Sequence, residues 1–281
     1  MFGVGVGIRV GGFTPSGGAT PYVGLLDTYP GASAAYSVRL LKSTYTGSAI
    51  RVRRSSDNAE QDIGFSGGNL DTTSLTSFCG AGNGFVTTWY DQSGNGVNAT
   101  QSTAANQPQI VSAGAIYTDI NGFPSIRMAG ELWMGTSAIL NNALLSTYKV
   151  MRTGGSLNQS GIIGAGNSAA DYIYFNTFAD NSYYYGSGSG GENQINAGLS
   201  INSNFIASTL NRSSTDRQVV TNALSIATSN VNKQTNFTMR INAQYRGLWG
   251  FANEIIAYPI GDSLATCQAK QNLINTYYGI Y

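Results

Sequence analysis

The sequence predicts an all-β protein, built as a sandwich or barrel of many short strands. Between residues 108 and 258, runs of β-branched and aromatic residues alternate with clusters of Gly, Asn and Ser, which is typical of antiparallel sheets rather than of βαβ units. Charged residues make up 10% of the chain, against about 25% in an ordinary globular domain. The 36 glycines and 17 tyrosines suit turns and strands, so composition and spacing favour the same class.

The first 24 residues differ from the remainder, because they are rich in glycine and end in a stretch of Pro, Ser and Gly at 14–21. We therefore expect residues 1–24 to be an arm or linker and residues 25–281 to form one β-sandwich domain. Val and Ile alternate with Gly and Arg between residues 4 and 10, a period of two. The arm either adds a strand to a neighbouring chain or is a frayed terminus.

Helix signals interrupt the strand pattern at three places. In the first, Tyr36, Leu40 and Leu41 form an apolar stripe at i, i+4 and i+5. In the last, Asp262 or Ser263 caps an amphipathic segment that closes the chain. The predicted helices are 32–42, 74–79 and 262–278, and the predicted strands are 49–54, 62–65, 85–90, 124–128, 147–151, 171–178, 204–210, 217–221, 236–242 and 248–258.

The stretch 89–100 is the densest turn signal of the chain, since an aromatic strand end runs into Asp, Ser, Gly and Asn. Asp91 is placed to accept from backbone N–H groups two residues on, while Gly94 and Gly96 supply positive φ without a Cβ penalty. Asn95 lies between these glycines. One carboxylate with a few amides is too small a set for Ca²⁺, so we predict a structural turn and no metal.

Several kinds of chemistry are excluded by composition. The chain has no histidine, which removes Ser-His-Asp and Cys-His catalysis together with imidazole metal sites. Cys79 and Cys267 are the only thiols, and buried free cysteines are the favoured interpretation, although the sequence leaves their pairing open. No cofactor is predicted, since the glycines at positions 3, 5 and 7 precede no helix and form no dinucleotide loop.

Charge and hydropathy exclude two further partners. A net charge of +1 gives no electrostatic case for nucleic acid, and no apolar run of about 20 residues predicts a membrane span. The start of the chain lacks a basic region followed by an apolar segment, so we expect no export signal.

Residues 34–98 resemble the catalytic domain of fungal-type α-L-arabinofuranosidases of the arabinofuranosidase B kind. The matching segments are 35–41, 45–49, 52–57, 76–79 and Trp89-Tyr90-Asp91-Gln92-Ser93-Gly94-Asn95-Gly96. The last strand at 249–259 and the closing helix resemble laminin-G-like, concanavalin A-like domains, which also occur in bacteriophage virion proteins. The resemblance implies a concanavalin A-like two-sheet β-sandwich (jelly roll) with a few short helices and a C-terminal helix.

Hydrolysis by such a domain needs a pair of carboxylates flanking the scissile bond. The resemblance implies a Glu nucleophile on a middle strand and an Asp general acid shortly before the last strand. Residues 239–249 contain no acid where that Asp is expected, and near the expected Glu only Asp180 and Glu192 are available, in Gly-, Ser- and Asn-rich segments. We therefore expect a chain that is not an enzyme, the alternative being an α-L-arabinofuranosidase-like glycoside hydrolase.

The combined expectation is a non-enzymatic bacteriophage virion structural protein, a capsid decoration, fibre or tail attachment protein that contacts host-surface glycans. A virion protein is made in the host cytoplasm and works outside the cell without an export signal; the alternative is a secreted protein. We expect a homotrimer that contacts other virion proteins through its arm. Some aromatic and amide side chains are of the types that stack on sugars or hydrogen-bond to them, and the alternative is that strands and loops simply contain them. These candidate sugar contacts are Trp133, Asn141, Asn142, Tyr183, Tyr184 and Tyr185.

Overall fold

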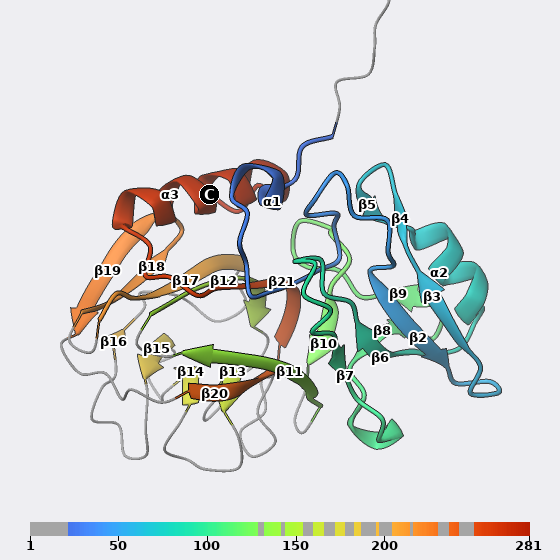
Figure 1. Ribbon diagram of the computed structural model, residues 1–281. Coiled ribbons are helices and arrows are strands. Elements are labelled where there is room, and N and C mark those ends of the chain that lie inside the picture. The colour runs from blue at the N-terminus through green and yellow to red at the C-terminus, as the bar shows by residue number, and fades with distance from the viewer. Residues whose placement is uncertain are drawn as a thin grey trace, which may run out of the picture.

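Two stacked antiparallel sheets and a lobe of shorter strands make up the fold (Figure 1). The computed structural model describes residues 22–128, 132–141, 144–153, 160–165, 172–177, 183–186, 195–196, 204–213, 216–229, 236–241 and 250–281. The predicted all-β two-sheet sandwich with few helices and a C-terminal helix is confirmed.

The first sheet is arranged around strand β21, which has β12 on one edge and both β10 and β1 on the other. Strands β17, β18 and β19 extend the sheet beyond β12. Its members are β1 (Ala34–Ser37), β10 (Ile126–Met128), β12 (Leu145–Thr153), β17 (Asn204–Asn211), β18 (Arg217–Thr221), β19 (Leu224–Ser229) and β21 (Gly250–Tyr258). Nearly every residue of β21 is buried, as a central strand covered on both faces requires.

Helix α3 (Leu264–Tyr278) lies across the outer face of the first sheet, next to the single turn α1 (Leu25–Thr28) (Figure 1). The hydroxyl of Ser263 accepts from the N–H of Thr266 at 3.1 Å and caps the helix, as one of the two predicted caps. Gly279 ends it with φ +60°, the left-handed conformation that glycine adopts without strain.

The second sheet lies below the first in Figure 1 and runs in the order β7, β11, β20, β13, β14, β15, β16. Its members are β7 (Ala99–Thr100), β11 (Met134–Asn141), β13 (Ser160–Ala165), β14 (Tyr172–Thr177), β15 (Tyr183–Gly186), β16 (Ile195–Asn196) and β20 (Asn236–Ile241). Because β7 also pairs with β6, this sheet is hydrogen-bonded to the N-terminal lobe.

The N-terminal lobe is a small sheet in which β2 lies between β3 and β6, and β8 joins β6 to β9. Its members are β2 (Ile50–Arg54), β3 (Glu60–Ile63), β6 (Gly84–Trp89), β8 (Gln109–Ser112) and β9 (Ala115–Ile116), with the hairpin β4 (Phe65–Ser66) and β5 (Asn69–Leu70), helix α2 (Thr72–Cys79) and a 3₁₀ turn at Ala104–Asn106. Asp71 accepts from the N–H of Ser74 and caps α2, so the helix predicted over 74–79 is present.

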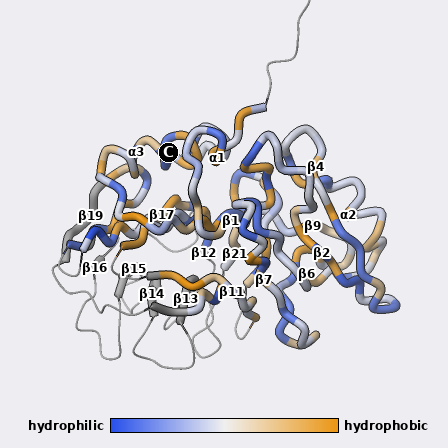
Figure 2. The backbone as a smooth tube through the Cα atoms, viewed as in Figure 1, coloured by the Kyte–Doolittle hydropathy of each residue, from blue (hydrophilic) through white to orange (hydrophobic). Residues whose placement is uncertain are grey.

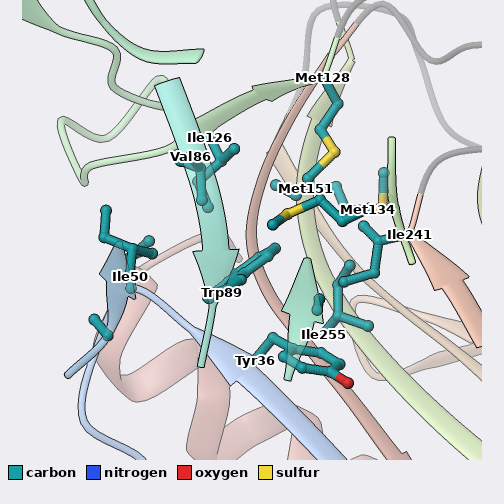
Figure 3. Packing of buried hydrophobic residues seen from close by; sticks show 14 of the residues in the cluster. Tyr36, Ile50, Val86, Trp89, Ile126, Met128, Met134, Met151, Ile241 and Ile255 are labelled. Carbon is teal, nitrogen blue, oxygen red and sulfur yellow. The ribbon is translucent and has the colours of Figure 1, made fainter. Parts of the chain in front are cut away.

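Buried apolar residues form two clusters on opposite faces of the first sheet. One joins the sandwich interior to the lobe, and Figure 3 shows Ile50, Val86 and Trp89 of the lobe packed in the same cluster as Met151 and Ile255 of the first sheet. The other lies under α1 and α3. Apolar residues follow the strands, whereas the turn between β2 and β3 is hydrophilic (Figure 2).

The helix predicted over 32–42 is wrong, because residues 34–37 form strand β1. Ala34 and Tyr36 face the cluster shared with the lobe, while Ala35 faces the cluster under α3. The strand pairs with β21 along its whole length. Burial on both faces and the ladder to β21 stabilise the extended form more than the apolar spacing stabilises a helix.

Cys79 and Cys267 are both buried and free, so the favoured interpretation of the two thiols is confirmed. Of the predicted arm, residues 1–21 lie outside the described residues, and the docking role and the trimer stay predictions. No helix in the described ranges has both the length and the apolar character that crossing a membrane requires.

Candidate functional site

Trp133 is held in place at the start of β11, on the second sheet. Its backbone N–H donates to the carbonyl of Asn106 at 3.2 Å, and its own carbonyl accepts from the amide of Gln101 at 2.9 Å. The indole ring lies beside Gly135, where an added Cβ would meet a ring carbon at 3.2 Å. Gly135 therefore leaves the space that the indole occupies.

Arg240 on β20 completes a cation–aromatic pair, because its guanidinium carbon lies 4.9 Å from the centre of the Trp133 ring. In the strand register Arg240 is opposite Gly135 on one side and Gly164 on the other. Arg240 is half-buried, and its register partner in each neighbouring strand is a glycine. Arg240 was missed at the sequence level, since only the pairing of β11, β20 and β13 reveals its position.

The backbone places four of the other predicted sugar contacts away from Trp133. Asn141 ends β11, at the opposite end of the strand, roughly 25 Å away at about 3.3 Å per residue. Strands β20, β13 and β14 separate β11 from β15, which Tyr183, Tyr184 and Tyr185 help to form. Asn142 lies outside the described residues. Of the predicted sugar contacts, Trp133 is the one whose side-chain surroundings the structure describes.

Asp91 organises the turn after β6 with both of its carboxylate oxygens. One oxygen accepts from the N–H groups of Ala35 and Ser93, each at 2.9 Å, and the other accepts from the N–H of Val97 at 3.2 Å. Gly94 and Gly96 have φ of +95° and +70°.

The amide of Asn95 donates to the carbonyls of Ala32 and Ser33 at 3.0 and 3.1 Å. Together with the bond from Ala35 to Asp91, this fixes the turn to the chain that enters β1. The residues of this turn therefore hold the lobe against the first sheet.

The carboxylates decide what chemistry the chain can perform. Of its 14 acidic residues, the ten in the described ranges each accept a hydrogen bond from a neighbouring group. Among the described residues there is no group of three His, Cys, Asp or Glu able to hold a metal ion. The remaining acids are Glu131, Asp171, Asp180 and Glu192.

Part of the chain is similar in sequence to a known catalytic domain. Residues 27–123 match the model of the arabinofuranosidase B catalytic domain. Over 75 residues the chain is 39% identical to a probable α-L-arabinofuranosidase B of Aspergillus flavus and equally to α-L-arabinofuranosidase B of Aspergillus oryzae. These matches cover 26% of this chain and 15% of each fungal protein. The predicted resemblance to this catalytic domain is confirmed.

Solved structures extend the similarity to most of the fold. A crystal structure of an arabinofuranosidase complexed with arabinofuranosyl-α-1,2-xylobiose aligns with a TM-score of 0.70 and 16% identity, over 89% of this chain and 64% of that one. A GH54 α-L-arabinofuranosidase soaked with a cyclic sulfate inhibitor aligns with a TM-score of 0.67 and 17% identity, with the same coverage. The chain thus spans less than two thirds of these relatives, and the likeness establishes the shared fold.

These matches contradict the expected non-enzymatic virion protein, and with it the capsid and tail roles. The proteins that resemble the lobe in sequence are arabinofuranosidases, and so are the proteins that resemble the sandwich in fold. The prediction gave one missing acid before the last strand more weight than the shared fold. Residues 217–253 do lack an acid, but four carboxylates occur in segments that the sequence pattern could not align. The missing acid was therefore not enough to exclude an enzyme.

Proposed function

We propose that this chain is a glycoside hydrolase that removes α-L-arabinofuranosyl groups from a carbohydrate. The observation that carries the proposal is the match of residues 27–123 to the arabinofuranosidase B catalytic domain, in a chain whose sandwich aligns with arabinofuranosidase structures over 89% of its length. The absence of histidine is consistent with it, since glycoside hydrolysis needs only carboxylates.

Two carboxyl groups divide the reaction between them. One protonates the glycosidic oxygen as the bond to the sugar breaks, while the other, ionised, either attacks the sugar carbon or takes a proton from the attacking water. The ten described carboxylates have structural partners, so we assign the pair to two of Glu131, Asp171, Asp180 and Glu192.

Trp133 and Arg240 are assigned to sugar contact rather than to bond breaking. An indole offers an apolar face for the C–H groups of a sugar ring, and a guanidinium offers N–H donors for its hydroxyls. Gly135 and Gly164 keep the adjacent positions free of side chains.

The test is release of nitrophenol from 4-nitrophenyl α-L-arabinofuranoside by the wild-type chain and by four amide variants, Glu131→Gln, Asp171→Asn, Asp180→Asn and Glu192→Gln. We expect two of them to lower kcat by about 10²-fold or more, the contribution of a positioned acid or base. Asp216→Asn, an exposed carboxylate paired with Arg212 at 3.3 Å, is the matched control and should retain wild-type activity.

Two results would overturn the proposal. One is wild-type release no faster than that of buffer, and the other is activity that all four variants retain. Binding of arabinosides without release would reduce the chain to a sugar-binding module.

A further inference from the structure

An open pocket of about 420 Å³ lies on the N-terminal lobe, among residues of α2, β2 and β3. Helix α2 packs beside β3 in this lobe (Figure 1). This volume falls within the range of roughly 300–1,000 Å³ that is usual for small-molecule sites. The lining residues are Arg54, Gln61, Thr73, Ser74, Ser77 and Phe78. None of them belongs to the second sheet, which carries Trp133 and Arg240.

Arg54 forms a fixed donor wall of this pocket. Its Nε and Nη2 donate to the two oxygens of Asp57 at 2.8 and 2.7 Å, and its Nη1 donates to the carbonyl of Phe78 at 3.2 Å. The guanidinium carbon lies 4.9 Å from the centre of the Phe78 ring. A guanidinium has five N–H donors, so two of them are left for a ligand.

Helix α2 and strand β3 add groups that both donate and accept. Thr73 and Ser77 are four residues apart on α2 and therefore share one face of the helix. Neither of these two hydroxyls makes a side-chain hydrogen bond to another described residue, and the same holds for the amide of Gln61 on β3. Ser74 is already engaged, since its hydroxyl donates to Asp71 at 2.6 Å.

The balance of charge selects the kind of ligand. Asp57 holds Arg54 through both carboxylate oxygens and cancels its charge within the wall itself. An anion would therefore meet a negative group beside the positive one. Hydroxyl groups match the remaining donors and acceptors, because a hydroxyl both donates and accepts.

We propose that this pocket binds one ring of a neutral sugar and is a second carbohydrate site of the chain, distinct from the site of hydrolysis. The sugar ring is held by two N–H donors of Arg54, the hydroxyls of Thr73 and Ser77, and the amide of Gln61. Such a site would keep a polysaccharide attached to the lobe while another part of it occupies the sandwich.

The test follows backbone amide NMR signals of the full-length chain during titration with L-arabinose and, separately, D-xylose. We expect saturable shifts in α2 and at the ends of β2 and β3, and these are scored separately from any shifts on the second sheet near Trp133 and Arg240. Ser77→Leu places an apolar side chain in the pocket and should raise the dissociation constant of the sugar at least tenfold. Thr76→Leu is the matched control, because Thr76 is exposed on the same helix but does not line the pocket, and it should bind as the wild type does.

A second variant, Gln61→Ala, keeps the test informative if Ser77→Leu loses the native spectrum, and it too should weaken binding. Absence of shifts with either sugar, or unchanged binding by both pocket variants, would overturn the proposal. Equal shifts with inorganic phosphate and none with sugar would identify an anion site and overturn it as well. Free monosaccharides have no glycosidic bond to break, so this outcome is independent of the hydrolase assay.

Discussion

Arg39 and Glu254 lie 215 residues apart in the chain and form a buried bidentate ion pair, with Nε to Oε2 at 2.7 Å and Nη2 to Oε1 at 3.0 Å. The two side chains are 5% and 0% exposed. Ser37 donates to the same carboxylate at 3.0 Å, and the guanidinium carbon lies 4.8 Å from the centre of the Tyr277 ring. The pair joins the segment after β1, strand β21 and helix α3.

Glu254→Gln should therefore destabilise the protein strongly. It leaves the Arg39 guanidinium buried without its counter-charge, and breaking a buried pair in this way costs about 3–5 kcal/mol. Urea denaturation followed by circular dichroism measures the change. Asp62→Asn is the control, because the Arg51–Asp62 pair is 43% and 38% exposed and should lose no more than about 1 kcal/mol. Equal losses in the two variants would contradict the assignment.

The turn after β6 provides a test of backbone conformation alone. Gly94 has φ of +95° and no atom within 4 Å of an added Cβ, so Gly94→Ala meets no clash but requires a disfavoured φ. We expect a loss of about 1–2 kcal/mol in the free energy of unfolding. Gly64→Ala has the same open surroundings without a positive φ and should be neutral or slightly stabilising. Thermal unfolding of the two variants measures the difference, and equal melting temperatures would contradict the prediction.

Lys149 makes stability depend on pH. It lies on β12 opposite Ala207 and Ile255, and complete burial lowers its pKa to about 7. Below about pH 7 the side chain is protonated in both states, and folding carries the full cost of burying the charge. Between pH 7 and its unfolded pKa of 10.5 only the unfolded state holds the proton, so native stability rises with pH.

Lys149→Met should therefore be more stable than the wild type at pH 6, by an amount bounded by about 5 kcal/mol. The advantage should shrink steadily as the pH approaches 10. Urea denaturation at pH 6, 8 and 10 gives the three differences. A difference that stays constant across this range would show that Lys149 does not titrate as proposed.

Thiol reactivity reports on the state of the two cysteines. Burial raises the pKa of Cys267 to about 11 and that of Cys79 above its usual value, so little thiolate exists at pH 8. Ellman's reagent should react slowly with native protein and release two equivalents rapidly in 6 M guanidinium. A disulfide between the two would instead give no reaction in the denatured chain without a reductant.

Local sequence rules predict the edges of the fold better than its centre. The caps of α2 and α3 depend only on Asp71 and Ser263 and their near neighbours, which is why both helices could be predicted. The helix prediction for residues 34–37 is wrong because β21, more than 200 residues away, determines their conformation. A stripe at i, i+4 and i+5 carries no information about such a distant partner.

The candidate site shows the same division. Trp133 could be chosen by residue type, but its neighbour Arg240 could not, because the two meet only through the pairing of β11 with β20. Asn141 was grouped with Trp133 by residue type, although an extended strand places the two at opposite ends. The lobe pocket likewise combines β2, β3 and α2, which have no common sequence pattern.

The position of β21 also determines when the protein can fold during its synthesis. Ser37 leaves the ribosome 217 residues before Glu254, with which it shares a hydrogen bond, while β2, β3 and β6 of the lobe find their partners nearby in the chain. The lobe can therefore assemble early, whereas β1 and β12 wait as open edges until β21 arrives between them. A chain that stops before Tyr258 exposes those edges to other chains, so only translation through the last strand yields a product protected from aggregation.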